Sequence, residues 1–197
     1  MKSHSINYES RQAARCAMEI PGQIRSSEAE FLYRLARRKG NIVEIGCLFG
    51  RSTSVLVQAA AVFGAEVTSV DPFYKTANTD QISSPELWRK NLEGLRLTPP
   101  KLMPMPSHAA AKFYEDEIAF LFMDGGHGYE TVSQDIADWI PKIKESGVVA
   151  FHDMFMPHLD GVARAVTEWW LAVFDAKAPV WKLEGMVGHT IAFRRVA

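Results

Sequence analysis

The sequence has 197 residues, of which 47% are hydrophobic and 23% are charged, and its formal net charge is -1. This length suits one α/β domain with a sizeable core, and the near-neutral charge gives no reason to expect nucleic acid or an anionic membrane as a partner. We therefore expect a small-molecule partner, and the composition leaves open whether the chain acts alone or as a homo-oligomer. There are two cysteines, no signal-peptide core and no apolar run of the roughly 18 residues that a membrane span needs, which together predict a cytoplasmic protein.

The N-terminal part of the sequence carries little pattern. Residues 1–25 are polar with scattered apolar positions, and we interpret them as an arm or lid, in which a short helix also fits, ahead of a single domain at 26–197. An amphipathic helix is predicted from Ser26, because Ser27 and Glu30 have the spacing of a capping box and Gly40 follows as a stop.

A strand, a glycine turn and a helix follow one another at the centre of the pattern. Asn41–Ile45 is rich in β-branched residues, Gly46 and Gly50 open a turn, and Ser52 leads into an apolar helix that ends at Gly64. Glycines let a backbone approach a ligand closely, and a helix start offers unpaired N–H groups. Such turns also occur for packing reasons alone, so both interpretations stand at this point.

The next strand ends in an acid. Glu66–Val70 alternates as a strand and Asp71 follows it, at the edge of the sheet where the glycine turn also lies. Two carboxylate oxygens there suit the two hydroxyls of a ribose, although an Asp before a proline is also common in turns. The irregular stretch from Asp71 to Pro100 predicts a substrate lid with a helix starting at Ser84. A short edge strand over Lys101–Pro106 and a helix starting at Ser107 and His108 follow.

Two further strands also end in acidic residues. Ala119–Met123 leads into Asp124, and Gly147–Phe151 leads into His152 and Asp153, with a helix predicted over 131–144 that bends at Pro141. Carboxylates at the ends of neighbouring parallel strands repel one another unless a cation joins them, and a hard divalent cation with oxygen ligands meets that need.

Three other polar residues follow these acids in the sequence. His127 lies on the turn after Asp124, where it suits a proton acceptor, although a turn histidine that bonds backbone is the alternative. We expect Asp135 to be a structural cap on a neighbouring loop or a solvated residue. Asp160 is expected at the start of a helix over 161–174.

Several of these segments together carry a family resemblance. In order and spacing, EIGCLFGRST, SVDPF, FLFMDGGHGYE and GVVAFHDM resemble class I S-adenosylmethionine-dependent methyltransferases, and within them the small-molecule O-methyltransferases that act on macrolide sugars or catechols. The resemblance covers residues from about 26 to the C-terminus. It implies an α/β fold of the doubly wound, Rossmann-like kind, with a seven-stranded, mostly parallel sheet, helices on both faces and an antiparallel last strand.

The resemblance also implies roles for single residues. Cofactor contacts fall on Glu44, Gly46, Gly50, Ser52, Asp71, Ser107, His108 and Asp124, with Glu44, Gly46 and Gly50 at the methionine end, Asp71 at the ribose and Ser107 with His108 at the adenine. The metal ligands are Asp124, His152 and Asp153, and the base is His127. Related enzymes have Glu before the second Asp or Asn after it, where this sequence has His152 and Met154. Since imidazole prefers later divalent metals, manganese is expected to be favoured over magnesium.

The function predicted from these observations is transfer of a methyl group from S-adenosylmethionine to an oxygen of a small molecule, assisted by Mg²⁺ or Mn²⁺. Two alternatives stay open. A glycine turn with an acid after the second strand also suits an NAD-dependent oxidoreductase. The unusual third metal ligand also fits a non-catalytic nucleotide-binding module on the same fold.

Overall fold

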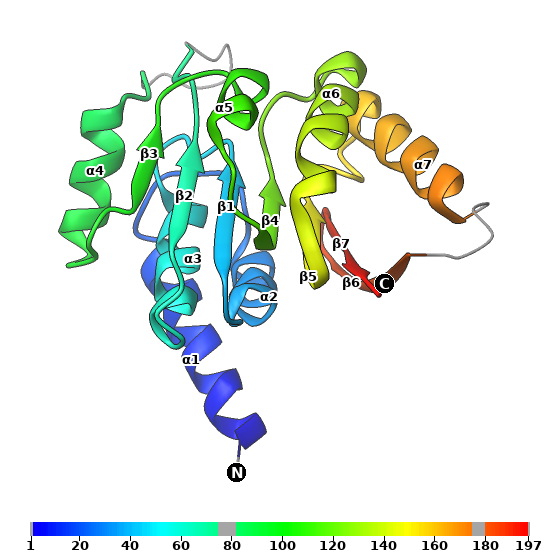
Figure 1. The fold of residues 1–197 in the computed structure, drawn as a ribbon. Coiled ribbons are helices and arrows are strands. Elements are labelled where there is room, and N and C mark those ends of the chain that lie inside the picture. Colours follow the sequence, from blue (N-terminus) through cyan, green and yellow to red (C-terminus); the bar gives the residue numbers. More distant parts are fainter. Residues whose placement is uncertain (1, 75–81, 175–179, 197) are drawn as a thin grey trace.

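The computed structural model describes residues 2–74, 82–174 and 180–196. Figure 1 shows one sheet with helices on both faces. The helices are α1 (Lys2–Ala17), α2 (Ser26–Ala36), α3 (Arg51–Ala61), α4 (Pro85–Gly94), α5 (Ser107–Phe113), α6 (Tyr129–Trp139), the 3₁₀-helix η1 (Ile140–Lys142) and α7 (Asp160–Phe174). The strands are β1 (Asn41–Ile45), β2 (Val67–Val70), β3 (Lys101–Met103), β4 (Ile118–Met123), β5 (Ile143–Phe151), β6 (Trp181–Val187) and β7 (Thr190–Arg195).

The seven strands follow the order β3-β2-β1-β4-β5-β7-β6. Strands β1 to β5 are parallel, and β7 runs antiparallel to both β5 and β6. This confirms the predicted fold class. Because the strand order reverses between β1 and β4, the loops after these strands diverge and leave a crevice at their carboxyl ends, where folds of this kind bind ligands.

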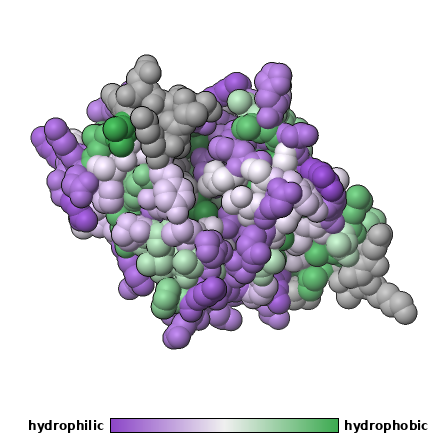
Figure 2. Space-filling view, turned by 90° about the horizontal axis from the view of Figure 1, so that it is seen from above, coloured by the Kyte–Doolittle hydropathy of each residue, from purple (hydrophilic) through white to green (hydrophobic). Residues whose placement is uncertain are grey.

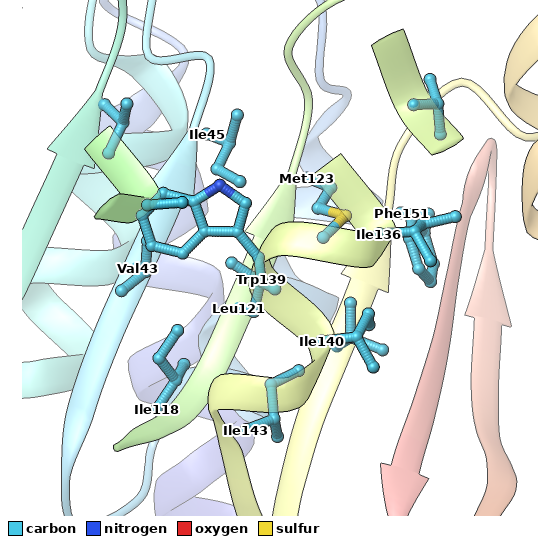
Figure 3. Packing of buried hydrophobic residues seen from close by; sticks show 14 of the residues in the cluster. Val43, Ile45, Ile118, Leu121, Met123, Ile136, Trp139, Ile140, Ile143 and Phe151 are labelled. Atoms are coloured by element: carbon cyan, nitrogen blue, oxygen red, sulfur yellow. The ribbon is translucent and has the colours of Figure 1, made fainter. Parts of the chain in front are cut away.

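Alternate residues along each central strand pack on opposite faces, and both faces are apolar, as expected for a parallel sheet covered on both sides. Ile42 and Phe122 pack in one cluster with residues of α1, α2 and α3, whereas Val43 and Leu121 pack in another with residues of α5, α6 and α7. On the second face Trp139 of α6 lies beside Val43 and Leu121 (Figure 3). These two layers hold the central strands rigidly below the crevice.

Helix α1 packs against α2 and α3 (Figure 1), and its Ala13, Ala14 and Ala17 are buried in the same cluster as the first sheet face. The small side chains let the helices approach closely. Whether residues 1–25 act as an arm or lid stays a prediction. No helix among the described residues is long and apolar enough to cross a membrane.

Two local predictions were wrong. Helix α6 ends at Trp139 rather than at 144, because Pro141 has no N–H to continue the helix, and the 3₁₀-helix η1 carries the chain into β5. At the start of α2 the capping side chain is Glu28 rather than Ser27 or Glu30, since the Glu28 carboxylate accepts the Arg25 N–H at 2.8 Å. The predicted lid at 71–100 includes 75–81, which lie outside the described residues.

The packing of α1 leads to a test. Ala14 is fully buried, so Ala14→Leu adds volume that the tight contact between α1, α2 and α3 must accommodate, and we expect a loss of about 1–3 kcal/mol in the free energy of unfolding. Arg15→Leu, at the exposed neighbouring position, is the control and should change stability by less than about 0.5 kcal/mol. Urea denaturation of both variants measures the difference. Equal stabilities would mean that α1 is a loosely held arm.

Candidate active site

A cavity of about 670 Å³ opens at the carboxyl ends of β1, β2 and β4. Figure 2 looks onto this end of the molecule, where the surface is hollowed near its centre. The volume lies within the range of about 300–1,000 Å³ that is typical of small-molecule sites. Its lining includes the turn 45–49, the connector 21–24 between α1 and α2, and the polar side chains of Arg51, Ser52, Asp71, Ser107, His108, Asp124 and His127.

The glycine turn after β1 is shaped by close contact with β4. Gly46 has a left-handed φ of +84°, and a Cβ atom at this position would lie 2.0 Å from the backbone oxygen of Asp124. Gly50, with a φ of +95°, is the N-cap of α3. Only glycine permits this conformation together with this approach, so the turn and the end of β4 form one continuous wall of the cavity.

Asp71 braces the same turn. One of its carboxylate oxygens accepts the backbone N–H groups of Cys47 and Leu48 at 2.9 and 2.8 Å, and the other accepts the N–H of Phe73 at 2.6 Å. Asp71 thus stabilises the turn. Because it also lines the cavity, the carboxylate lone pairs that its backbone partners do not use can accept hydrogen bonds from a ligand. The ribose contact stays a prediction.

Glu44 lies under the turn and is absent from the residues that line the cavity. It is fully buried, and its Oε2 accepts the hydroxyls of Thr53 at 2.6 Å and Ser69 at 2.8 Å. The indole N–H of Trp88 donates to Thr53 in turn, which ties α4 to this network. Burial raises the pKa of Glu44 to about 7, since the hydroxyl donors compensate only in part. Any influence of Glu44 on a ligand acts through the turn above it.

Ser107 and His108 begin α5 on the opposite side of the cavity. The Ser107 hydroxyl donates to Asp135 of α6, so Asp135 is buried rather than solvated, and its structural partner is the start of helix α5 rather than a loop. Burial raises the pKa of Asp135 to about 6. His108 is exposed.

Asp124, His127, His152 and Asp153 come together beside the cavity. The His152 Nδ1 atom lies 2.9 Å from Asp124 Oδ1 and 3.1 Å from Asp153 Oδ1, while His127 Nε2 lies 2.8 Å from Asp153 Oδ2. Asp153 has a left-handed φ of +57°, a conformation that costs of order 1–3 kcal/mol and lets its carboxylate meet the imidazole of its own neighbour. The sequence predicted this grouping, and the structure shows it.

Charge pairing governs protonation in this cluster. Burial raises the pKa of Asp124. Burial opposes the charge of His152 as well, but the surrounding carboxylates outweigh it and raise the pKa of His152 to about 12. The hydrogen bond to Asp153 raises the pKa of His127. Asp153 responds in the opposite direction, since its two imidazole partners outweigh burial and lower its pKa.

Three residues of the site were not found from the sequence. Glu28 is fully buried, and its Oε1 lies 3.4 Å from His152 Nε2. Arg51 lines the cavity and donates to the backbone oxygens of Ile20 and Ile24 at 2.7 and 2.9 Å, so it holds the α1–α2 connector against the cavity. Gly161 of α7 packs so tightly that a Cβ atom would lie 2.4 Å from the His127 backbone oxygen. None of the three carries a local sequence signal, because each partner is distant along the chain.

The fold and this site define a class I methyltransferase. The chain belongs to the methyltransferase domain family, whose model matches residues 43–154. It therefore falls among S-adenosylmethionine-dependent enzymes, and the oxidoreductase alternative finds no support.

Solved structures share the fold at low sequence identity. The O-methyltransferase NovP is 18% identical with a TM-score of 0.74, and each chain covers 100% of the other. The SAH-bound methyltransferase PaMTH1 from Podospora anserina is 17% identical with a TM-score of 0.65 over 98% of this chain and 88% of that one. A putative caffeoyl-CoA O-methyltransferase from Staphylococcus aureus is 15% identical with a TM-score of 0.65 over 98% and 92%.

The raised pKa of Glu44 predicts a pH-dependent stability. The folded chain holds the Glu44 proton more tightly than the unfolded chain, whose pKa is about 4.5. The contribution of Glu44 to the free energy of unfolding is therefore largest below about pH 4.5. It declines by roughly 3 kcal/mol in total as the pH rises to about 7.

Glu44→Gln should abolish this decline. The difference in free energy of unfolding, variant minus wild type, should therefore be about 3 kcal/mol larger at pH 8 than at pH 4.5. Urea denaturation across this range measures it. Glu66→Gln, which removes an exposed acid just before β2, is the control and should leave the pH profile unchanged. If Glu44→Gln and wild type give parallel profiles, Glu44 is ionised in the folded chain throughout.

Proposed function

We propose that this chain transfers the methyl group of S-adenosylmethionine to an oxygen of a small molecule, with help from a divalent cation. The observation that carries the proposal is the position of Asp124. Its backbone meets the glycine turn on one side, and its carboxylate meets the His152 and Asp153 cluster on the other. The cofactor side and the acceptor side of the reaction thus share one residue, which lies in the wall of a single cavity.

In this proposal the cofactor lies along the turn. Gly46 and Ser52, which line the cavity, would contact its methionine end, where backbone can approach closely, and Gly50, which does not line it, would act by shaping the turn. Asp71 would bind the ribose hydroxyls while it keeps its backbone partners, and Ser107 with His108 would lie at the adenine. The SAH bound by PaMTH1, a methyltransferase of the same fold, supports the choice of cofactor. Glu44 would act indirectly, through the turn above it.

The metal ligands in the proposal are Asp124, His152 and Asp153. Their nearest ligand atoms all lie within 4.8 Å of one another. Neighbouring ligands on an octahedral ion at about 2.1 Å are about 3.0 Å apart. The His152 Nδ1 contacts to Asp124 and Asp153, at 2.9 and 3.1 Å, fit that spacing. When bound, such a cation lowers the pKa of an acceptor hydroxyl and aligns its oxygen.

His127 is the proposed proton acceptor. Its side chain is 38% exposed and lines the cavity, so an acceptor hydroxyl can reach it, and Asp153 holds its imidazole. The new O–CH₃ bond forms as the S–CH₃ bond breaks, the sulfonium becomes a neutral thioether, and the hydroxyl proton passes to His127 and then to water. The protein's task is mainly alignment, because the sulfonium is already activated.

A small acceptor is favoured by the size of the cavity and the net charge of -1. The O-methyltransferases among the similar structures agree with an oxygen acceptor. A non-catalytic module on this fold stays the second candidate, because His152 replaces an acidic metal ligand. Turnover of S-adenosylmethionine separates the two.

The cofactor assignment is tested by calorimetry. We expect S-adenosylmethionine and S-adenosylhomocysteine to bind at least about tenfold more tightly than NAD, and Asp71→Ala to weaken this binding by about 1.5–3 kcal/mol, the range for hydrogen bonds to a charged group. Asp116→Ala, an exposed acid outside the cavity, is the control and should bind like the wild type. Tighter binding of NAD than of either sulfur nucleotide would show that the proposal is wrong.

The metal assignment is tested by thermal melts. At a hundredfold excess of Mg²⁺ or Mn²⁺ over Kd, mass action should raise the melting temperature by roughly 5–10 °C in the wild type, and Asp124→Asn and Asp153→Asn should lose the shift. Asp135→Asn changes a buried acid outside the cluster and should keep it. Methyl transfer should stop when a chelator is added. If the chelator changes neither melting nor methyl transfer, catalysis is metal-independent and His127 acts alone.

A further inference from the structure

The imidazole of His152 is buried between carboxylates on both of its nitrogen sides. Its side chain is only 3% exposed. Nδ1 faces Asp124 and Asp153, as described above, and Nε2 faces Glu28 Oε1 at 3.4 Å. Nε2 is buried and makes no hydrogen bond of standard geometry within the described residues, so the Glu28 carboxylate is the acceptor that this N–H meets.

Glu28 is held in place from several directions. Its Oε2 accepts the Arg25 N–H at the start of α2, and its Oε1 accepts the His189 N–H at 2.8 Å and the Thr190 hydroxyl at 3.3 Å. The turn between β6 and β7 approaches so closely that a Cβ atom on Gly188 would lie 2.7 Å from Oε1. The carboxylate therefore has one defined position, directed at His152.

Capping a helix does not require a fully buried acid, because a capping glutamate works equally well at the surface. Burying its charge is costly unless the charge has partners. The inward position of Glu28, at 0% exposure, therefore serves contacts besides the cap, one to the β6–β7 turn and one toward His152. The buried group next to it that lacks a standard partner is the Nε2 atom of His152.

We infer that Glu28 is a positioning residue that holds the Nε2 proton of His152, so that Nδ1, which gives up its own proton when a cation binds, faces Asp124 and Asp153 as the third metal ligand. Histidine ligands commonly donate their other N–H to a carboxylate, which fixes the tautomer and strengthens the ligand. This inference rests on the metal assistance proposed above. It also explains how an imidazole serves where related enzymes have an acid. The carboxylate of Glu28 on α2 supplies the negative charge, and it makes Nδ1 a stronger ligand by accepting the N–H on the other side of the ring.

The experiment uses the full-length, metal-free protein and Mn²⁺ as the probe, with free Mn²⁺ followed by electron paramagnetic resonance. Glu28→Gln removes the charge that faces Nε2, and we expect Mn²⁺ to bind about 10–100-fold more weakly. Thr190→Val is the matched control, since it breaks another contact of Glu28 without touching His152. It should lower the metal-free melting temperature, as Glu28→Gln does, but keep the Kd for Mn²⁺ within about twofold of the wild type.

A second measurement needs no variant. In wild-type protein with ¹⁵N-labelled histidine and saturating Mg²⁺, two-bond ¹H–¹⁵N correlations should show His152 protonated at Nε2 and unprotonated at Nδ1. The opposite tautomer overturns the inference, as does wild-type affinity for Mn²⁺ in Glu28→Gln. Wild-type affinity in Glu28→Gln leaves the metal site itself intact, and the opposite tautomer removes only His152 from its ligands. A wild type that binds neither Mn²⁺ nor Mg²⁺ overturns both the metal assistance and the role of Glu28.

Discussion

The rest of the structure depends on holding three carboxylates close together, two of them buried and the third at the cavity wall. Asp124, Asp153 and Glu28 meet two imidazoles, His152 and His127, within contacts of 2.8–3.4 Å. An unpaired charge in this setting costs several kcal/mol, so the position of each side chain depends on the others. The five groups come from α2, from the ends of β4 and β5 and from the turn before α6. Pairing therefore fastens segments that are up to 125 residues apart in the sequence to the carboxyl ends of the central strands.

Backbone contacts complement this pairing of charges. Gly46 brings the turn after β1 against the end of β4, and Gly161 brings the start of α7 against the turn that carries His127. Close packing of this kind transmits small displacements, because interiors are dense and adjust only in part. A displacement of the glycine turn would therefore shift Asp124, and a displacement of α7 would shift His127.

Much of the fold was predictable from the sequence, and so were the glycine turn and the strand-end residues of the site, because their signals are local. Buried strands, the glycine turn and strand-end acids each follow from a few adjacent residues, and parallel strands bring those ends together. Helix α1 was ambiguous, since its buried alanines stand in a polar sequence. Glu28 was missed because its partners His152 and His189 lie 124 and 161 residues away, and burial of an acid is decided by tertiary contacts.

The two fully buried glutamates show that the kind of partner, and not burial alone, sets the charge at the site. Glu44 meets only hydroxyls, and burial raises its pKa to about 7. Glu28 meets two backbone N–H groups and an imidazole, which outweigh burial and lower its pKa to about 2. Since hydrogen bonds from N–H dipoles and charged rings favour the carboxylate far more than hydroxyls do, only Glu28 is fully ionised near neutral pH. The negative charge is therefore concentrated around His152, beside the strand ends, rather than under the glycine turn.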